Sequence, residues 1–322
     1  MPIQLAFIVF FISIVLVIRS GSVIVRRLSR VARFFQISEF VAAFVLISIA
    51  TSLPDFFVGV LSALHGAPEL SFSNIIGANI ATLTIALGPA VILARGLEVS
   101  SSTIRRETLY AAFAAVLPII LFLDGAISRV DGVVLLIFAI WYFIRLVSQK
   151  GRFPEVFSNS DTYLINFKEF VRDFFVLAIA AMFLILGAEG VIQSALAIAS
   201  SLEISISIIG ILLVALSITL PEIVFGVRAV MMGHKSMVLG NVIGSIVVNS
   251  GFVIGTTALI APISVPSFDP YIVGMIFTAI VAAMFILYAH TNKKITTFEG
   301  FSLVAVYIIF VFVLFAFNGS VV

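Results

Sequence analysis

Cysteine is absent from this 322-residue chain, and charged residues make up only 11% of it. The missing cysteine excludes disulfide bonds and thiolate metal sites. A soluble globular domain carries about 25% charged residues, so the scarcity of charge argues against one. The chain is instead 62% hydrophobic, and no low-complexity segment interrupts it. This composition predicts an integral membrane protein.

Apolar segments long enough to cross a bilayer as helices recur along the whole chain. A spanning helix needs about 20 apolar residues, and these segments lack the period-two alternation of a barrel strand. The first segment has no basic leader and no clear cleavage site, so we expect a span and not a removed signal. The ten predicted spans are 4–25, 38–63, 73–94, 108–126, 130–148, 173–199, 204–230, 236–260, 270–290 and 297–317.

Two similar motifs lie 167 residues apart. The first reads Thr-Ser-Leu-Pro-Asp at 51–55, followed by Asn-Ile-Ile-Gly-Ala-Asn at 74–79. The second reads Ile-Thr-Leu-Pro-Glu at 218–222, followed by Asn-Val-Ile-Gly-Ser at 241–245. The offset holds without a gap between the copies. The chain therefore contains an internal repeat.

The repeat divides the chain into halves of five spans each. Because five is odd, the two copies of the motif cross the membrane in opposite directions, as in many secondary transporters with a midplane site. The predicted fold is an all-α membrane protein of ten transmembrane helices, arranged as two inverted-topology five-helix repeats. The predicted boundaries are 1–148 for the first repeat, 149–172 for a cytoplasmic linker and 173–322 for the second repeat.

Basic residues lie almost entirely on one side of this topology. All Lys and Arg except Arg129 fall in the connections after the odd-numbered spans. The positive-inside rule makes these connections cytoplasmic, so both termini are expected outside a prokaryotic-type cell membrane. We expect the protein to contact membrane lipid and transported cations, and not nucleic acid. Nothing in the sequence specifies an oligomeric state.

Each copy of the motif places an acid directly after a proline inside an apolar span. Pro54 precedes Asp55, and Pro221 precedes Glu222. A proline inside a helix frees the carbonyl four residues earlier, and an acid at membrane depth usually has a function. Carboxylate, carbonyl and hydroxyl oxygens suit Ca2+ or Na+. Prolines alone can simply kink a helix, but the doubled acid favours a cation site.

Other polar residues of the chain are expected either at this site or away from it. Thr82 and Asn249 each lie 27 residues after one of the two acids, and we expect both to face the site. Glu189 has no acidic counterpart in the other half, so it fits either a functional membrane acid or a residue in a wet crevice. His65 is expected in a loop at the end of a span.

On these motifs the chain resembles the cation/calcium exchanger superfamily, and within it the microbial sodium/calcium exchangers. The resemblance covers essentially the whole chain. It implies ten transmembrane helices with both termini outside, and exchange of Ca2+ for Na+ by alternating access. It also implies that the first and sixth helices slide across the others. No cofactor is expected.

The resemblance also implies which residues hold the ions. It places two central carboxylates at Asp55 and Glu222, and it adds the carbonyls of Thr51 and Ile218 to a Ca2+ site. Two Na+ sites would use carbonyl and hydroxyl groups, from Ala215, Ile218, Thr219 and Ser245 for one and from Ser48, Thr51 and Ser52 for the other.

This chain departs from the family pattern at five positions. Asp55 replaces a glutamate, Ala78 a serine, Thr82 an asparagine, Asn249 an aspartate and Ile218 a threonine. The change at Ile218 would leave a backbone carbonyl ligand in place. Two carboxylates balance one Ca2+, whereas three Na+ would leave a positive charge at a depth where charge is costly. We therefore expect coupling that differs from three Na+ per Ca2+, with either fewer Na+ or H+ as the counter-ion.

The predicted function is a secondary antiporter that exchanges Ca2+ for Na+, with the cation site at the midplane between spans 2, 3, 7 and 8. The alternative is an H+-driven antiporter of Ca2+ or another divalent cation. An enzyme is not expected, since an intramembrane aspartyl protease needs two aspartates and the second acid is Glu222. A channel is disfavoured by the inverted repeat, which is typical of transporters.

Overall fold

The computed structural model describes residues 2–34, 47–99, 102–148, 167–231, 233, 235–264, 269–291 and 293–318, and most of these residues are helical. The helices and strands, in chain order, are α1 (Ile3–Phe34), α3 (Ile47–Leu64), α4 (Pro68–Ala81), η2 (Thr82–Ala86), α5 (Leu87–Leu93), β1 (Leu97–Glu98), α6 (Ser102–Leu121), η3 (Phe122–Asp124), β2 (Ala126–Ile127), α7 (Arg129–Ser148), α8 (Phe167–Leu202), α9 (Ile206–Ile208), η5 (Ile209–Val214), α10 (Ala215–Met231), α11 (Lys235–Val247), η6 (Val248–Val253), α12 (Ile254–Ile260), β3 (Ile263–Ser264), α13 (Asp269–His290), β4 (Lys294–Ile295) and α14 (Thr297–Asn318).

The described residues contain nine helical segments that are long and apolar enough to span a membrane, and a shorter apolar helix at Ser48–Leu64. An all-helical membrane protein is therefore confirmed. Three of the segments are composite, because a π-helix (η2, η5 or η6) interrupts the α-helix. The first part of the second predicted span, 38–46, lies outside the described residues.

Part of the predicted linker is helical. Helix α8 begins at Phe167, so residues 167–172 belong to the same helix as the sixth predicted span. The rest of the predicted linker, 149–166, lies outside the described residues. The polar composition of this stretch hid the helix start, because its charged residues precede the apolar part of the same helix.

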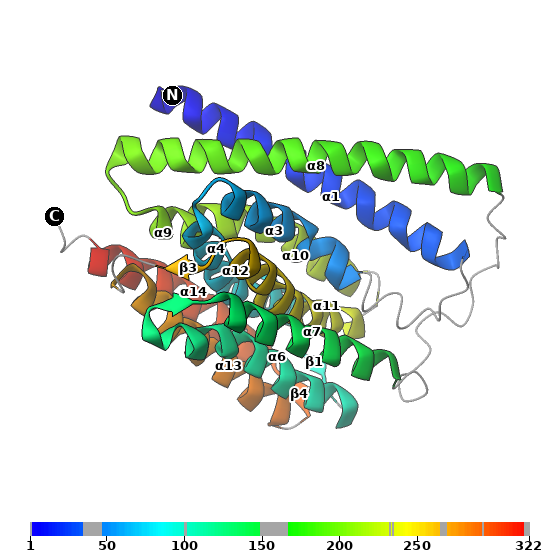
Figure 1. Cartoon of the computed structure of the whole chain (residues 1–322). Helices are drawn as coiled ribbons and strands as arrows, with labels where there is room; N and C mark the ends of the chain where they lie inside the picture. Colours follow the sequence, from blue (N-terminus) through cyan, green and yellow to red (C-terminus); the bar gives the residue numbers. More distant parts are fainter. Residues whose placement is uncertain are drawn as a thin grey trace.

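Helices α1 and α8 form a separate layer across one face of the other helices (Figure 1). They run antiparallel and contact closely, because Gly187 and Gly190 of α8 face α1. A Cβ atom at Gly187 would lie 3.1 Å from both the Ser13 carbonyl oxygen and the Val17 amide nitrogen. Small residues permit this close approach between helices in a membrane.

The two most buried spans lie at the centre of the molecule. In the segment Pro68–Leu93, 83% of an apolar 18-residue stretch is buried, and in Met237–Ile260 the buried share of such a stretch is 89%. The other spans are at most half buried, as expected for helices that face lipid on one side. The central pair contains the second part of each motif, Asn74–Asn79 and Asn241–Ser245.

Two short strand pairs connect the halves of the chain. Strand β1 pairs with β4, and β2 pairs with β3, both antiparallel. With the 167-residue offset of the motifs, β1 corresponds to β3 and β2 to β4, so each pairing is the counterpart of the other. Likewise, α5 packs against α14 and its counterpart α12 packs against α7. The halves are thus interlocked.

Candidate cation site

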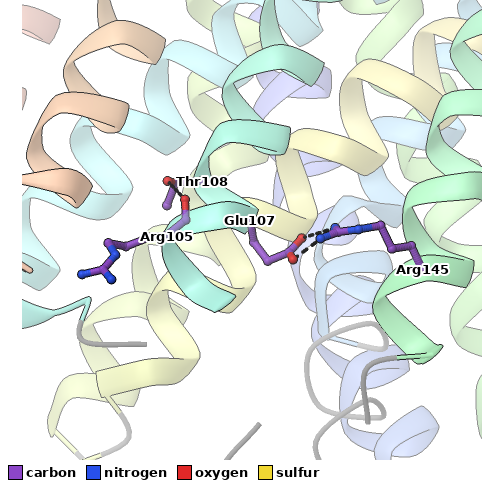
Figure 2. Close-up of polar contacts among 4 residues, drawn as sticks. All are labelled: Arg105, Glu107, Thr108 and Arg145. Atoms are coloured by element: carbon purple, nitrogen blue, oxygen red, sulfur yellow. Dashed lines mark hydrogen bonds and ion pairs between the residues drawn. The ribbon is translucent and has the colours of Figure 1, made fainter. Parts of the chain in front are cut away.

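Four acidic side chains are buried among the described residues, and two of them have an arginine partner. The Arg145 guanidinium of α7 donates from Nη1 to both carboxylate oxygens of Glu107 in α6, at 3.1 and 3.2 Å (Figure 2). Asp173 accepts from Arg27. The remaining buried acids are Asp55 and Glu222, the two that follow the prolines of the motif.

Asp55 lies in α3 and is 1% exposed. The Asn74 side chain of α4 donates from Nδ2 to Oδ1 of Asp55, at 2.7 Å. The π-helix η6, which carries Asn249, packs against α3. Asp55 is thus held between one span of its own half and one span of the other.

Glu222 lies in α10 and is 2% exposed. Its carboxyl group interacts electrostatically with that of Asp55, so the two acids of the repeated motif are neighbours. The Oε2 atom of Glu222 has no hydrogen-bond partner among the described residues. Two carboxylates this close and this deeply buried need either a bound cation or a proton to offset their repulsion.

One turn before Asp55, the hydroxyl group of Thr51 connects the two halves. Its Oγ1 atom lies 3.2 Å from the Ser48 carbonyl oxygen, 3.2 Å from Oδ1 of Asn241 and 3.2 Å from Oγ of Ser245. All four side chains are buried. The family resemblance assigns Thr51 and Ser245 to different Na+ sites, and in the structure their hydroxyl groups are in direct contact.

The corresponding threonine of the second half makes a local contact. The Thr219 hydroxyl group donates to the Ala215 carbonyl oxygen at 2.7 Å, one turn back in α10. Thr219 and Ile218 are both buried. The four residues that the resemblance assigns to one Na+ site are thus all in the protein interior, with Ser245 on the neighbouring α11.

Several buried oxygen atoms in this region lack a hydrogen-bond partner. Buried polar groups are bonded in the great majority of cases, so a cluster of unpaired oxygens needs an explanation. A hard cation that takes six to eight oxygen ligands would provide one. Apart from the Tyr142 hydroxyl in α7, the unpaired oxygens of the described residues belong to Ser52, Asn74, Asn79, Thr82, Glu222 and Asn249.

The positions of Thr82 and Asn249 depend on a feature that the sequence did not predict. Thr82 begins the π-helix η2, and Asn249 lies in the π-helix η6. η2 packs against α10, the helix of Glu222, while η6 packs against α3, the helix of Asp55. π-Helical turns are frequent at functional sites. Each half therefore presents its π-helix to the acid-bearing helix of the other.

Close helix packing supports the same arrangement. A Cβ atom at Gly77 of α4 would lie 2.1 Å from the Ile211 carbonyl oxygen and 2.6 Å from Cβ of Ala215. Since no side chain larger than hydrogen fits, α4 lies directly against the chain that leads into Glu222. Small residues permit such close packing between membrane helices.

The structure also brings in residues that the ligand prediction left out. Asn74 and Asn241 belong to the motif, but only the structure shows their contacts. Asn74 donates to Asp55, and Asn241 accepts from Thr51. Ser250 accepts from Nδ2 of Asn79 at 2.9 Å. No pattern in the sequence identified Ser250, because its counterpart in the first half is Leu83.

Glu189 lies outside this site. Its Oε2 atom is 2.7 Å from Nε2 of His65, and its Oε1 atom accepts from Gln193 at 3.0 Å. The side chains of His65 and Glu189 are 36% and 37% exposed. Of the two alternatives for Glu189, this geometry favours the accessible crevice, and it connects α8 to the turn that follows α3.

A family model and several proteins match most of the chain. The model of the sodium/calcium exchanger protein family matches residues 5–147 and 173–316. An uncharacterized membrane protein of Methanocaldococcus jannaschii, MJ0091, is 32% identical over 87% of this chain and 88% of its own length. The sodium/calcium exchanger MaX1 of Methanosarcina acetivorans is 25% identical over 96% of this chain and 98% of its own length.

Solved structures agree with these matches. The sodium-calcium exchanger NCX_Mj, in a crystal soaked with Na+ and Sr2+, superposes with a TM-score of 0.66 and 29% identity, and the match covers 95% of this chain and 98% of the other. A crystal of the same exchanger soaked with zero Na+ and Ca2+ gives a TM-score of 0.64. The similarity extends over both halves and includes the residues of the candidate site.

Proposed function

The chain belongs to the sodium/calcium exchanger protein family, and on this basis we propose that it is a secondary antiporter that exchanges Ca2+ for Na+. The observation that carries the proposal is the pair of buried neighbouring carboxyl groups, Asp55 and Glu222, which have no basic partner in the described residues. The relatives named for their ions are sodium/calcium exchangers. None of them favours H+ as the driving ion.

The proposed architecture has ten transmembrane helices in two inverted repeats, with boundaries near 1–148 and 173–322. The reciprocal pairing of β1 with β4 and β2 with β3 supports it, as does the positive φ angle shared by Gly66 and Gly233, 167 residues apart. The distribution of Lys and Arg supports external termini in a prokaryotic-type cell membrane.

In the proposed site, Ca2+ binds between the carboxylates of Asp55 and Glu222, with the Thr51 and Ile218 carbonyls as further ligands. The Na+ sites flank it. One takes carbonyl and hydroxyl oxygens from Ala215, Ile218, Thr219 and Ser245, and the other takes them from Ser48, Thr51 and Ser52. Thr82 and Asn249 line the cavity from the π-helices. Burial and the cluster of unpaired oxygens support this assignment.

The exchange mechanism follows from overlap of these sites. Because Thr51 contacts Ser245 across the halves, Ca2+ and Na+ would use neighbouring oxygens and compete. A site filled with cations is charge-neutral, and only a neutral site can pass through a low-dielectric state. We propose that the layer of α1 and α8 moves across the remaining helices to expose the site alternately to each side.

The test is Ca2+ uptake into proteoliposomes driven by an outward Na+ gradient. Asp55→Asn and Glu222→Gln should each reduce uptake by about 100-fold or more, since Ca2+ affinity depends on the number of charged ligands. Glu189→Gln is the matched control, because it removes a carboxylate from a membrane span outside the site, and it should retain transport. Normal uptake by both site variants would contradict the assignment.

A further inference from the structure

Helices α1 and α8, which form the layer on one face of the molecule (Figure 1), enclose a groove with a volume of about 300 Å³. Ligand pockets in proteins begin at about this volume. Apart from Arg19 and Ser20, the residues that line the groove are apolar. Two of them, Ile179 and Phe183 of α8, are 53% and 41% exposed. The groove is therefore open at the surface of the layer, where an acyl chain can enter it.

Arg19 is a charged residue inside a membrane span and on its outer surface. The span of α1 is Ile3–Val23, so Arg19 lies one turn before its end. The side chain is exposed, and it forms no ion pair within the residues that the structure describes. Charged residues within spans usually face the bundle interior and are paired. An arginine at this depth can instead extend to the headgroup region, where a lipid phosphate supplies the missing anion.

A second arginine lies at the same end of the layer. Arg172 of α8 is exposed and lies three residues before the span that begins at Phe175. It is also about one helical turn before Val176, which lines the groove. The neighbouring acid, Asp173, is buried and already paired with Arg27. Arg172 is thus placed to bind an anion at the end of the groove.

The charge of this end of the layer is strongly positive. Between residues 19 and 34, α1 carries five arginines and no acid. The first turns of α8, residues 167–173, contain two basic and two acidic residues, whose formal charges offset each other. Basic clusters beside a membrane span attract anionic headgroups. An apolar groove that ends in a basic cluster matches the two parts of a phospholipid.

We propose that this groove binds one anionic phospholipid, with an acyl chain between α1 and α8 and the phosphate group at Arg19 and Arg172. Guanidinium groups bind phosphate oxygens through charge-assisted hydrogen bonds. In the proposed orientation this end of the layer is cytoplasmic, so the lipid belongs to the inner leaflet. The site is distinct from the proposed ion site, since none of its residues is an ion ligand there.

The experiment titrates delipidated protein in detergent with phosphatidylglycerol and counts the bound lipid by native mass spectrometry. One lipid should bind saturably, and more tightly than phosphatidylcholine with the same acyl chains, because the arginines favour a headgroup with net negative charge. Binding that does not saturate, or equal binding of the two lipids, would overturn the proposal. The measurement needs no ion gradient, so its result is independent of the proposed exchange function.

Variants test the two parts of the site separately. Arg19→Gln and Arg172→Gln should each raise the Kd for phosphatidylglycerol about fivefold, the contribution of one basic residue near a headgroup. Val176→Trp keeps the charge but fills the groove, so it should also weaken binding. An unchanged Kd for Val176→Trp would overturn the placement of the acyl chain.

Arg106→Gln is the matched control for the two arginine variants. Arg106 is an exposed arginine of α6 in a connection assigned to the same side of the membrane, and it does not line the groove. Its removal should leave the Kd for phosphatidylglycerol unchanged. If Arg106→Gln weakens binding as much as Arg19→Gln does, the lipid is attracted by the general positive charge of this side, and the proposed site is wrong.

Discussion

At the scale of single residues, neutral polar side chains orient the carboxylate of Asp55 and connect the two halves at the site. The Asn74 amide donates to Asp55, and Thr51 contacts groups from both halves. Asp55 is one methylene shorter than Glu222, so its carboxylate depends more on neighbours for its position. Groups that orient a metal ligand typically change affinity by 10- to 100-fold when they are removed.

Asn74→Ala should therefore weaken Ca2+ transport without abolishing it. The variant loses the 2.7 Å hydrogen bond to Asp55 and leaves the carboxylate free to rotate, so we expect the KM for Ca2+ to rise by about tenfold with a smaller change in maximal rate. The KM comes from initial rates of Ca2+ uptake over a range of Ca2+ concentrations. Ser73→Ala is the control, because Ser73 bonds the Glu69 carbonyl oxygen; an equal rise in its KM would argue against the role of Asn74.

At the scale of helices and strands, buried ion pairs and π-helices fix the arrangement around the site. Glu107 and Arg145 connect α6 to α7 (Figure 2). The guanidinium group also lies 4.2 Å from the ring centroid of Tyr110. Figure 2 shows Arg105 pointing away from this pair. Each charge of this pair already has its partner, so the pair is not available to a transported ion, and removal of one partner would leave the other buried and uncompensated.

Arg145→Ala should destabilise the protein by about 3–5 kcal/mol, since it leaves Glu107 buried and unpaired. Thermal unfolding in detergent would show the loss as a lower Tm. The double variant Glu107→Gln with Arg145→Met should recover most of it, because neither uncompensated charge remains. Arg105→Ala is the matched control on α6. If Arg105→Ala lowers the Tm as much as Arg145→Ala does, the ion pair is not responsible.

At the scale of the whole molecule, the halves interlock, and α1 and α8 form a layer on one face of the other helices (Figure 1). The hydrophobic residues of α1 and α8 share one core cluster with Val58 of α3, Leu70 of α4 and Ile218 of α10, and those of α6, α7, α13 and α14 belong to another. The layer therefore packs on the two helices that carry the acids. Movement of this layer would change the packing next to Asp55 and Glu222 directly, which is the physical basis for placing the proposed movement there.

The proposed orientation can be tested directly, because the chain has no cysteine. Asp124 and Thr291 are both exposed. Asp124 ends η3, beside the connection assigned to the outside, and Thr291 lies in a connection assigned to the cytoplasm. An Asp124→Cys variant should react with a membrane-impermeant maleimide on intact cells, whereas Thr291→Cys should react only after the membrane is opened. The reverse pattern of labelling would mean that both termini face the cytoplasm.

Much of this protein could be predicted from the sequence, because spans and motifs are local properties. Helices α7 and α9 to α14 begin and end close to the predicted spans 5 and 7 to 10, whereas α6 and α8 each begin six residues before the predicted start, in charged sequence. The buried position of all the predicted site residues follows from the apolar runs that contain them. The ion ligands themselves stay a prediction that the proposed variants test.

What the sequence determined by itself was the membrane class, the internal repeat and the two acids after prolines, since hydropathy and repetition need no knowledge of neighbours. The tertiary structure decided which acids remain without a basic partner. Glu107 and Glu222 are equally buried, but only Glu107 has an arginine beside it. It also decided that the Asn74 amide of the neighbouring span donates to Asp55. Such contacts join residues far apart in the chain, and only helix packing can bring them together.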